Sequence, residues 1–336
     1  MRRLGRCLFF SLLCGVGLGC TSTAAQAAEQ AKQLEQTEQA EQTEQADDPA
    51  LVDKFREGLT YSVNASARWL DSFFTDEINP ADYNTASGSL TLTPEWDEYD
   101  GFSIDSSFRA KVVFPHAKRR FSAIIGRGDF DDFINDTQQT RPSVIRRDQA
   151  DEEWMLGLGF DPYVEDHHSL SFGAGIRGGI NLDPYVRARY RYETIADENT
   201  EYRLQSVAFW RDSDGFGVAQ TVTVDTALTD RWFNKVWVRG TFAERTEGVR
   251  WHASEKIYYM YHHERAIGAE IWWYGETGHQ VPLQDVGLRA IHRSRYSRDW
   301  LYFQTWVGVH WPREVVTETR QPRWLVGFEI EMLFGN

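Results

Sequence analysis

Cysteine is scarce in this chain, and its three occurrences, Cys7, Cys14 and Cys20, all lie within the first 20 residues. If this leader is removed, no thiol remains to form a disulfide, ligate a metal or act as a nucleophile. An exported bacterial envelope protein commonly avoids thiols in this way, because the compartment outside the cytoplasm is oxidising.

Long apolar runs are also missing after the leader. A helix that crosses a bilayer needs roughly 20 apolar residues, and no segment beyond residue 28 approaches that length. The sequence therefore excludes a helical membrane protein. If the chain enters a membrane, it must do so as a closed β-barrel, because only helices and barrels satisfy all their backbone groups in lipid.

Residues 1–27 have the organisation of a signal peptide. Arg2, Arg3 and Arg6 precede an apolar run of about a dozen residues, and the small-residue stretch Ala25-Gln26-Ala27 follows. Cys20 leaves lipidation open as an alternative, although the preceding residues match a lipobox poorly. The sequence predicts export with cleavage after Ala27.

The next two segments differ in composition from the remainder. Residues 28–50 repeat Glu-Gln-Thr-Glu-Gln-Ala without a large apolar residue and hold much of the formal charge of −14, which predicts a solvated acidic periplasmic spacer. Residues 51–75 carry Val52, Phe55, Leu59 and Val63 at helical spacing, which favours a short amphipathic helix in the periplasm. A strand is an alternative for this segment.

From residue 84 to 336 apolar and polar residues alternate in runs of about ten residues, which suits tilted strands crossing a hydrocarbon slab. The runs lie near 86–95, 102–114, 120–128, 153–161, 169–181, 184–194, 201–211, 216–228, 233–244, 248–261, 266–274, 285–295, 300–311 and 323–334. They predict an all-β fold, a transmembrane antiparallel β-barrel of about 14 strands. A large soluble sandwich or propeller is the alternative.

Connection lengths support the barrel. The long connections at 129–152, 275–284 and 312–322 all fall on one side of the predicted barrel, and the connections on the other side are short. Outer-membrane barrels have this asymmetry, with long extracellular loops and short periplasmic turns.

The last run of residues alternates an apolar face with an acidic one. Phe328, Ile330, Met332 and Phe334 share the face predicted to meet lipid, and they indicate an assembly signal for the barrel assembly machinery. Glu329 and Glu331 then face the lumen, because a carboxylate facing lipid at mid-depth costs on the order of a few kcal/mol.

Four short motifs resemble those of uncharacterised outer-membrane β-barrel proteins of Gram-negative bacteria. They are Asp183-Pro184-Tyr185-Val186-Arg187-Ala188-Arg189, Ser213-Asp214-Gly215-Phe216-Gly217, Pro312-Arg313-Glu314 and Glu331-Met332-Leu333-Phe334-Gly335. The resemblance implies a barrel in the outer membrane and brings no activity with it.

The predicted lumen face is rich in cations. It carries Arg109, Lys111, Arg177, Arg187, Arg189, Arg191, Arg203, Arg239, Arg289 and Arg293, and its carboxylates include Glu193, Glu270, Glu329 and Glu331. Rings of arginine and lysine bias a pore toward negative solutes, which favours a passive channel or binding pore for small anions. A closed barrel laced by internal salt bridges is the structural alternative.

Three other motifs give only weak evidence for a catalytic or binding function. Gly173-Ala174-Gly175-Ile176-Arg177-Gly178 matches a dinucleotide-binding pattern but runs into a predicted strand instead of a helix. His263-Glu264 begins a zinc motif whose second histidine is replaced by Ile267. The segment His167-His168-Ser169 and His310 leave a lipid-modifying enzyme as a second alternative. We expect no cofactor, no metal and no nucleic-acid partner; the expected partners are outer-membrane lipid, the assembly machinery and small anionic solutes.

Overall fold

The computed structural model describes residues 53, 56–57, 86–114, 120–128, 153–165, 167–178 and 182–335. Its strands are β1 Ala86–Asp97, β2 Gly101–Val113, β3 Phe121–Gly128, β4 Glu153–Val164, β5 His168–Arg177, β6 Asp183–Asp197, β7 Thr200–Arg211, β8 Gly215–Ala227, β9 Trp232–Ala243, β10 Val249–His262, β11 Arg265–Glu276, β12 Leu283–Arg295, β13 Leu301–His310 and β14 Arg323–Phe334.

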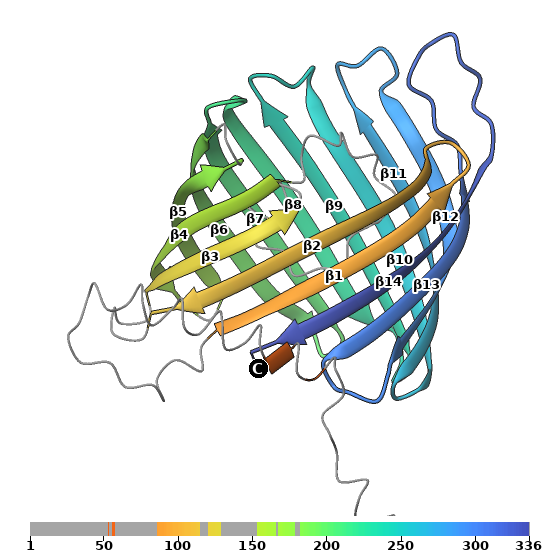
Figure 1. Cartoon of the computed structure of the whole chain (residues 1–336), viewed down its shortest axis with the longest axis horizontal. Helices are drawn as coiled ribbons and strands as arrows, with labels where there is room; N and C mark the ends of the chain where they lie inside the picture. Colours follow the sequence, from red (N-terminus) through yellow and green to blue (C-terminus); the bar gives the residue numbers. More distant parts are fainter. Residues whose placement is uncertain are drawn as a thin grey trace, which may run out of the picture. The chain divides into compact units, whose positions relative to one another are not determined.

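The 14 strands form one closed antiparallel barrel (Figure 1). Each strand pairs with its neighbours in sequence, and β1 pairs with β14 through the register Leu92↔Ile330 and Glu95↔Gly327. The predicted fold class is therefore confirmed, and each predicted run falls on one observed strand. Closure satisfies the backbone of both terminal strands and leaves no free sheet edge.

The barrel has two unlike ends. The terminal end carries the start of β1 and the end of β14, together with short connections such as His263–Glu264. The opposite end, called the loop end below, carries the connections at 129–152, 277–282 and 311–322. This is the predicted asymmetry of connection lengths.

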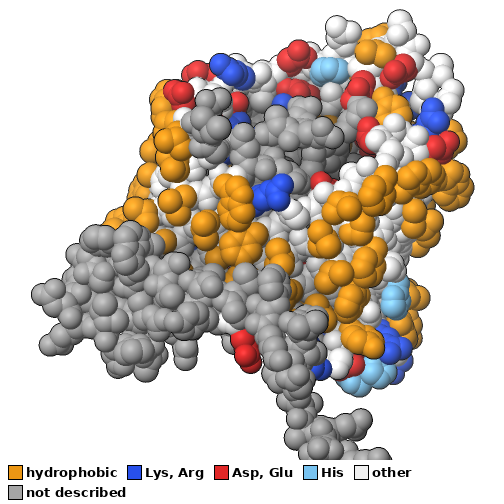
Figure 2. Space-filling view, viewed as in Figure 1, with side chains coloured by type: hydrophobic (Ala, Val, Ile, Leu, Met, Phe, Trp, Pro, Cys, Tyr) orange, Lys and Arg blue, Asp and Glu red, His pale blue; other side chains and the backbone are white. Residues whose placement is uncertain are grey.

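The wall of the barrel has an apolar outer face and a polar inner face. Along β6, Val186 is 49% exposed while Arg187 and Arg189 are buried, and along β14 Val326 is 49% exposed while Glu329 is buried. Apolar side chains gather along the barrel wall on the face seen in Figure 2. This arrangement is the reverse of a soluble fold, and it is the one that hydrocarbon on the outside stabilises.

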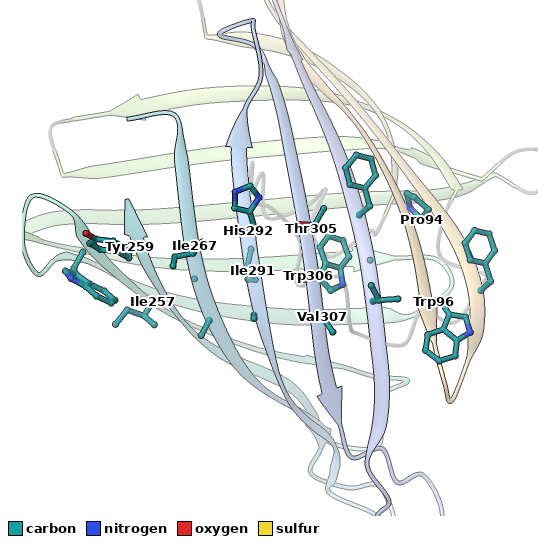
Figure 3. A pocket seen from close by; sticks show the side chains of 18 residues that line it. Pro94, Trp96, Ile257, Tyr259, Ile267, Ile291, His292, Thr305, Trp306 and Val307 are labelled. Carbon is teal, nitrogen blue, oxygen red and sulfur yellow. The ribbon is translucent and has the colours of Figure 1, made fainter. Parts of the chain in front are cut away.

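An apolar depression crosses the outer face from β9 to β2 (Figure 3). Small side chains at Ala269, Ala290 and Thr305 form its lining together with larger ones such as Trp96 and Tyr259. The Trp232 and Tyr259 rings lie 4.9 Å apart near the terminal end. Aromatic pairs at such heights are typical of the membrane–water boundary.

Side chains reinforce the junction of β1 and β14 on both faces. On the outside, Phe334 of β14 lies over Gly88 of β1 and stacks on Phe108 of β2. On the inside, Trp306 of β13 lies over Gly327 of β14, and its indole nitrogen donates to Glu95 Oε2 of β1 at 2.9 Å. In both cases a glycine leaves room for an aromatic side chain to reach the strand beyond it.

The predicted signal peptide, 1–27, and spacer, 28–50, lie outside the described residues. Asp53, Arg56 and Glu57 are helical, whereas the remainder of the 51–75 segment is outside the described residues, so the amphipathic helix stays a prediction. Arg56 belongs to the same compact unit as the barrel, and its Nε donates to the Leu333 carbonyl at 3.1 Å. Among the described residues, no helix has the length and apolarity to span a membrane.

Candidate functional site in the barrel lumen

A ladder of three arginines runs along the inner face of β6. Arg187, Arg189 and Arg191 occupy alternate positions, so their side chains share one face and rise about 7 Å per step. Arg189 Nε donates to Ser171 Oγ at 3.0 Å, and Arg191 Nε donates to Gln205 Oε1 at 3.0 Å. These neighbours orient the guanidinium groups through uncharged acceptors.

Glycine in β5 makes room for this ladder. A side chain at Gly173 would meet Arg187, with a Cβ 2.8 Å from Arg187 Nε. Gly175 and Gly157 lie under the Tyr185 hydroxyl in the same way. The glycine-rich segment at 173–178 is therefore barrel wall, as predicted, with Gly173 and Gly175 within β5.

A second cationic group lies near the terminal end of β6 and β7. Arg203 Nε contacts Glu193 Oε1 at 2.7 Å, and Arg203 Nη2 contacts Glu201 Oε1 at 2.8 Å. Arg191 Nη1 is 3.7 Å from the same Glu193 oxygen. Glu193 therefore lies between Arg191, the ladder arginine nearest the terminal end, and Arg203.

Across the lumen, ion pairs dominate the wall. Glu270 of β11 is fully buried between Arg289 Nε, at 2.6 Å, and Lys256 Nζ, at 3.4 Å. The Arg289 guanidinium also lies 5.1 Å from the centre of the Trp306 ring, which adds a cation–π contact. One carboxylate is thus held by two cations from β10 and β12.

Arg293 connects β12 to β14 in the same wall. Its Nη2 contacts Glu331 Oε2 at 2.6 Å, and its Nη1 is 4.0 Å from Glu329 Oε1. Its guanidinium lies 4.9 Å from the Tyr302 ring centre. Both acidic residues of the C-terminal strand therefore face inward, as predicted.

His310, at the loop end of β13, lies between two carboxylates. Nε2 is 3.0 Å from Asp97 Oδ2 of β1, and Nδ1 is 3.1 Å from Asp285 Oδ1 of β12. The indole nitrogen of Trp272 donates to the other Asp285 oxygen at 3.0 Å. This chain of contacts joins β11, β12, β13 and β1 across the inner face.

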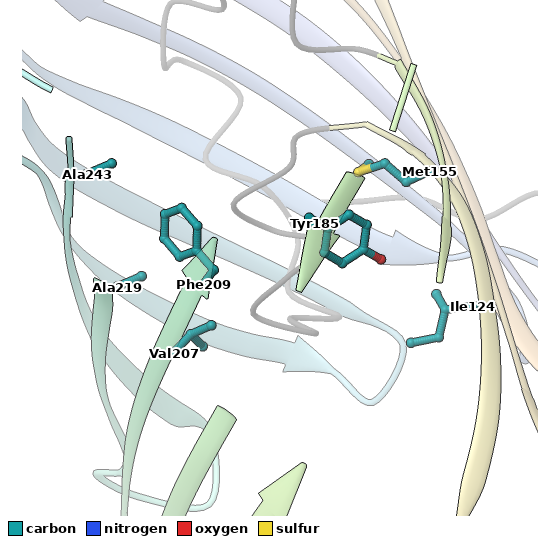
Figure 4. Close-up of a cluster of buried hydrophobic side chains, with 7 residues drawn as sticks. All are labelled: Ile124, Met155, Tyr185, Val207, Phe209, Ala219 and Ala243. Carbon is teal, nitrogen blue, oxygen red and sulfur yellow. The ribbon is translucent and has the colours of Figure 1, made fainter. Parts of the chain in front are cut away.

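An apolar cluster also faces the interior, which the sequence reading did not predict. It consists of Ile124, Met155, Tyr185, Val207, Phe209, Ala219 and Ala243 (Figure 4). Phe209 lies over Gly217, and Tyr185 lies over Gly157 and Gly175. A glycine on the lumen phase beside an aromatic residue on the next strand is the signal that could have revealed these contacts.

The remaining predicted lumen residues also lie on the inner phase. Arg109 and Lys111 are in β2, Arg177 is buried at the loop end of β5, and Arg239 Nε of β9 donates to Thr221 Oγ1 at 3.3 Å. The Arg239 guanidinium lies 4.9 Å from the Trp237 ring centre. The structure thus distributes the predicted cations around the barrel instead of gathering them in one ring.

The two halves of the lumen differ in charge. The inner face of β5–β7 carries Arg177, Arg187, Arg189, Arg191, Arg203 and Arg211 against Asp183, Glu193 and Glu201. β6 and β13 are opposite each other in the closed strand order, and Glu270, Glu329, Glu331, Asp285 and Asp97 cluster on the β13 side. Arginines thus outnumber carboxylates on β5–β7, whereas the carboxylates on the β13 side lie beside Lys256, Arg289, Arg293 and His310.

The histidines that suggested an enzyme are engaged by other groups. His310 is bonded by Asp97 and Asp285, and His168 Nδ1 is 2.7 Å from the Tyr190 hydroxyl. His167 Nδ1 is 3.0 Å from the Glu193 carbonyl. Each of these ring nitrogens thus has a partner other than a serine hydroxyl.

No protein-family model matches the chain, and no curated protein shows significant sequence similarity to it. Solved barrels do resemble it. The KdgM porin has a TM-score of 0.32 at 9% identity, over 72% of this chain and 97% of the porin. OmpT, an outer membrane protein of Vibrio cholerae, has a TM-score of 0.41 at 10% identity, over 74% and 96%. A Pseudomonas aeruginosa FadL homologue has a TM-score of 0.42 at 10% identity, over 74% and 89%. These values support no inference about the solute.

Proposed function

We propose that this protein is a channel in the outer membrane of a Gram-negative bacterium, with its N-terminal segment in the periplasm, and that its lumen passes or binds small anionic solutes. The apolar outer face and the closed 14-strand wall support membrane insertion. The observation that carries the anion preference is the ladder of Arg187, Arg189 and Arg191 on one inner strand face.

The ladder suits successive binding of one anion. A guanidinium group stays charged at any working pH and can donate two parallel hydrogen bonds to a carboxylate or phosphate. Adjacent groups about 7 Å apart allow an anion to exchange one partner for the next. Ser171 and Gln205 are uncharged acceptors that orient Arg189 and Arg191, and Arg191 also lies 3.7 Å from Glu193.

The proposal is tested by ion selectivity in planar bilayers. Replacing all three ladder arginines with glutamine keeps similar volume and removes the charge. We expect the reversal potential in a salt gradient to shift away from anion preference, while the barrel stays folded. The matched control is R265Q/R298Q, which makes the same chemical change at the terminal end outside the ladder. Unchanged selectivity in the ladder variant would contradict the anion preference.

A second candidate is a structural envelope barrel with a closed lumen. The ion-paired wall around Glu270 and Arg293 and the apolar cluster around Val207 favour it, because both fill inner space. This function predicts wild-type protein that inserts into bilayers without conductance. In that case the ladder variant would show no conductance before or after the change and would instead lower the unfolding temperature, because Arg189 and Arg191 lose their hydrogen bonds to Ser171 and Gln205.

A further inference from the structure

We propose that the β10–β11 turn is a binding site for one divalent transition-metal ion, with zinc as the representative ligand. The site consists of His262, His263 and Glu264, whose potential ligand atoms all lie within 4.8 Å of one another. The two imidazole rings are 3.9 Å apart between centroids. Two imidazoles and one carboxylate form a donor set that suits zinc, with water at the remaining position.

The backbone of the turn brings the three donors together. His262 pairs with Arg265, so His263 and Glu264 alone make the hairpin connection. Both histidines are exposed, which gives an ion direct access and lets the side chains rotate. Ligand atoms about 2.1 Å from a tetrahedral zinc ion are about 3.4 Å apart, so the donors need to approach by only about 1.4 Å.

Hydrogen bonds hold two of the donors in place at the turn. Arg295 Nη2 donates to Glu264 Oε1 at 3.0 Å, which holds the carboxylate in place at the turn. The backbone N–H of Glu264 donates to His262 Nδ1 at 3.3 Å. That bond is long, so a metal ion can replace it.

Arg295 does not lose its only carboxylate when a metal ion takes Glu264. Its Nη2 is 3.0 Å from Glu264 Oε1, whereas its Nη1 is 3.2 Å from Asp299 Oδ1. Asp299 can therefore continue to neutralise Arg295. The exchange of Glu264 from Arg295 to the metal leaves neither charge stranded, and because both groups are near water the rearrangement is inexpensive.

The chain provides a matched control in its other adjacent pair of histidines. His167 and His168 lie at the β4–β5 connection of the same barrel end, but their Nδ1 atoms are engaged by the Glu193 carbonyl and the Tyr190 hydroxyl. They therefore offer two adjacent histidines, His167 exposed and His168 partly buried, without the preassembled three-donor set. Comparing variants of the two histidine pairs therefore distinguishes a specific three-donor site from the general affinity of exposed histidine for metal ions.

The test is isothermal titration of zinc chloride into the purified full-length barrel in detergent, prepared without a histidine tag. Each variant is first shown to migrate as a compact barrel on an unheated gel. We expect wild-type protein and H167A/H168A to bind one ion with the same affinity. H262A/H263A is expected to lose at least about a hundredfold in affinity, and E264Q about tenfold.

Two results would overturn the site. One is equal loss of affinity in H167A/H168A and H262A/H263A, which would mean that zinc binds exposed histidines without selection. The other is unchanged affinity in E264Q, which would remove the carboxylate from the donor set. Because the readout is metal binding, neither result depends on conductance through the lumen.

Discussion

Phe334 and Phe108 stack with their ring centroids 5.9 Å apart and their planes inclined by 12°, although strand β1 separates the strands that carry them. Gly88 makes the contact possible, because a side chain there would occupy the space of the Phe334 ring. Phe334 is 1% exposed despite its position on the outer phase. The residue predicted as an assembly signal is thus also a packing contact across the junction of the barrel.

Replacing Phe334 with alanine should weaken this junction. Loss of a fully buried phenylalanine costs about 3 kcal/mol, which we expect to appear as a lower temperature for loss of the compact gel band and as less protein in the membrane. Leu333→Ala is the control, because Leu333 lies on the opposite phase and is only partly buried. Equal effects of the two substitutions would contradict the stacking role.

Gly327→Ala should also be destabilising, on the inner face. The added methyl group would overlap the Trp306 ring and disturb its hydrogen bond to Glu95, at a cost of about 1–3 kcal/mol. Gly240→Ala on β9 is the control, because its Cβ would meet only Val249 Cγ1, at 3.2 Å. Urea unfolding followed by tryptophan fluorescence measures the stability of both variants. Equal stability of Gly327→Ala and Gly240→Ala would contradict the predicted overlap between the new methyl group and the Trp306 ring.

The Glu270 network predicts a large difference between single and combined substitutions. Glu270→Gln leaves Lys256 and Arg289 as neighbouring buried cations, which we expect to cost about 3–5 kcal/mol. The combination E270L/K256M/R289M removes all three charges and should be close to wild type in unfolding free energy. A neutral effect of Glu270→Gln alone would show that water compensates the two cations.

At the terminal end, the Glu264–Arg295 pair predicts a pH dependence. Because the hydrogen bond from Arg295 lowers the pKa of Glu264 in the folded protein, its stabilising effect is present at neutral pH and is lost as pH falls through the lowered pKa. The unfolding free energies of wild type and Glu264→Gln should therefore differ at neutral pH and converge in acid. Urea titrations with a chelator present measure this, and Asp230→Asn in another short turn is the control. A difference that grows in acid would contradict the assignment.

The strands and their orientation could be predicted from the sequence because hydrocarbon imposes a simple rule on every position. Positions that face the lipid, such as those of Val186 and Val326, must carry apolar side chains. The length of each strand follows from the thickness of the hydrocarbon layer. The same rule predicts that Glu329 and Glu331 face the lumen, and in the structure both lie beside Arg293.

The contacts inside the lumen could not be predicted in this way. Trp306 and Glu95 are 211 residues apart and meet only because closure fixes the register of β1 against β14. Inward-facing side chains contact charged, polar and apolar neighbours, so this face includes Arg189, Val207 and Tyr185. The alternating pattern therefore does not show which of these residue types lies at a given inward position. Which cation faces which carboxylate depends on the curvature and stagger of the whole wall.

The junction of β1 and β14 also sets an order of events in time. β1 is the first strand of the barrel to be synthesised, and β14 is the last. The Phe334–Phe108 stack and the Trp306–Glu95 hydrogen bond each join an early part of the chain to a late one. Phe334 belongs to β14, and Trp306 reaches Glu95 across Gly327 of β14, so both contacts form only once β14 is in place. Closure is thus stabilised at the last stage of synthesis, and a chain that ends before β14 lacks the Phe334–Phe108 stack.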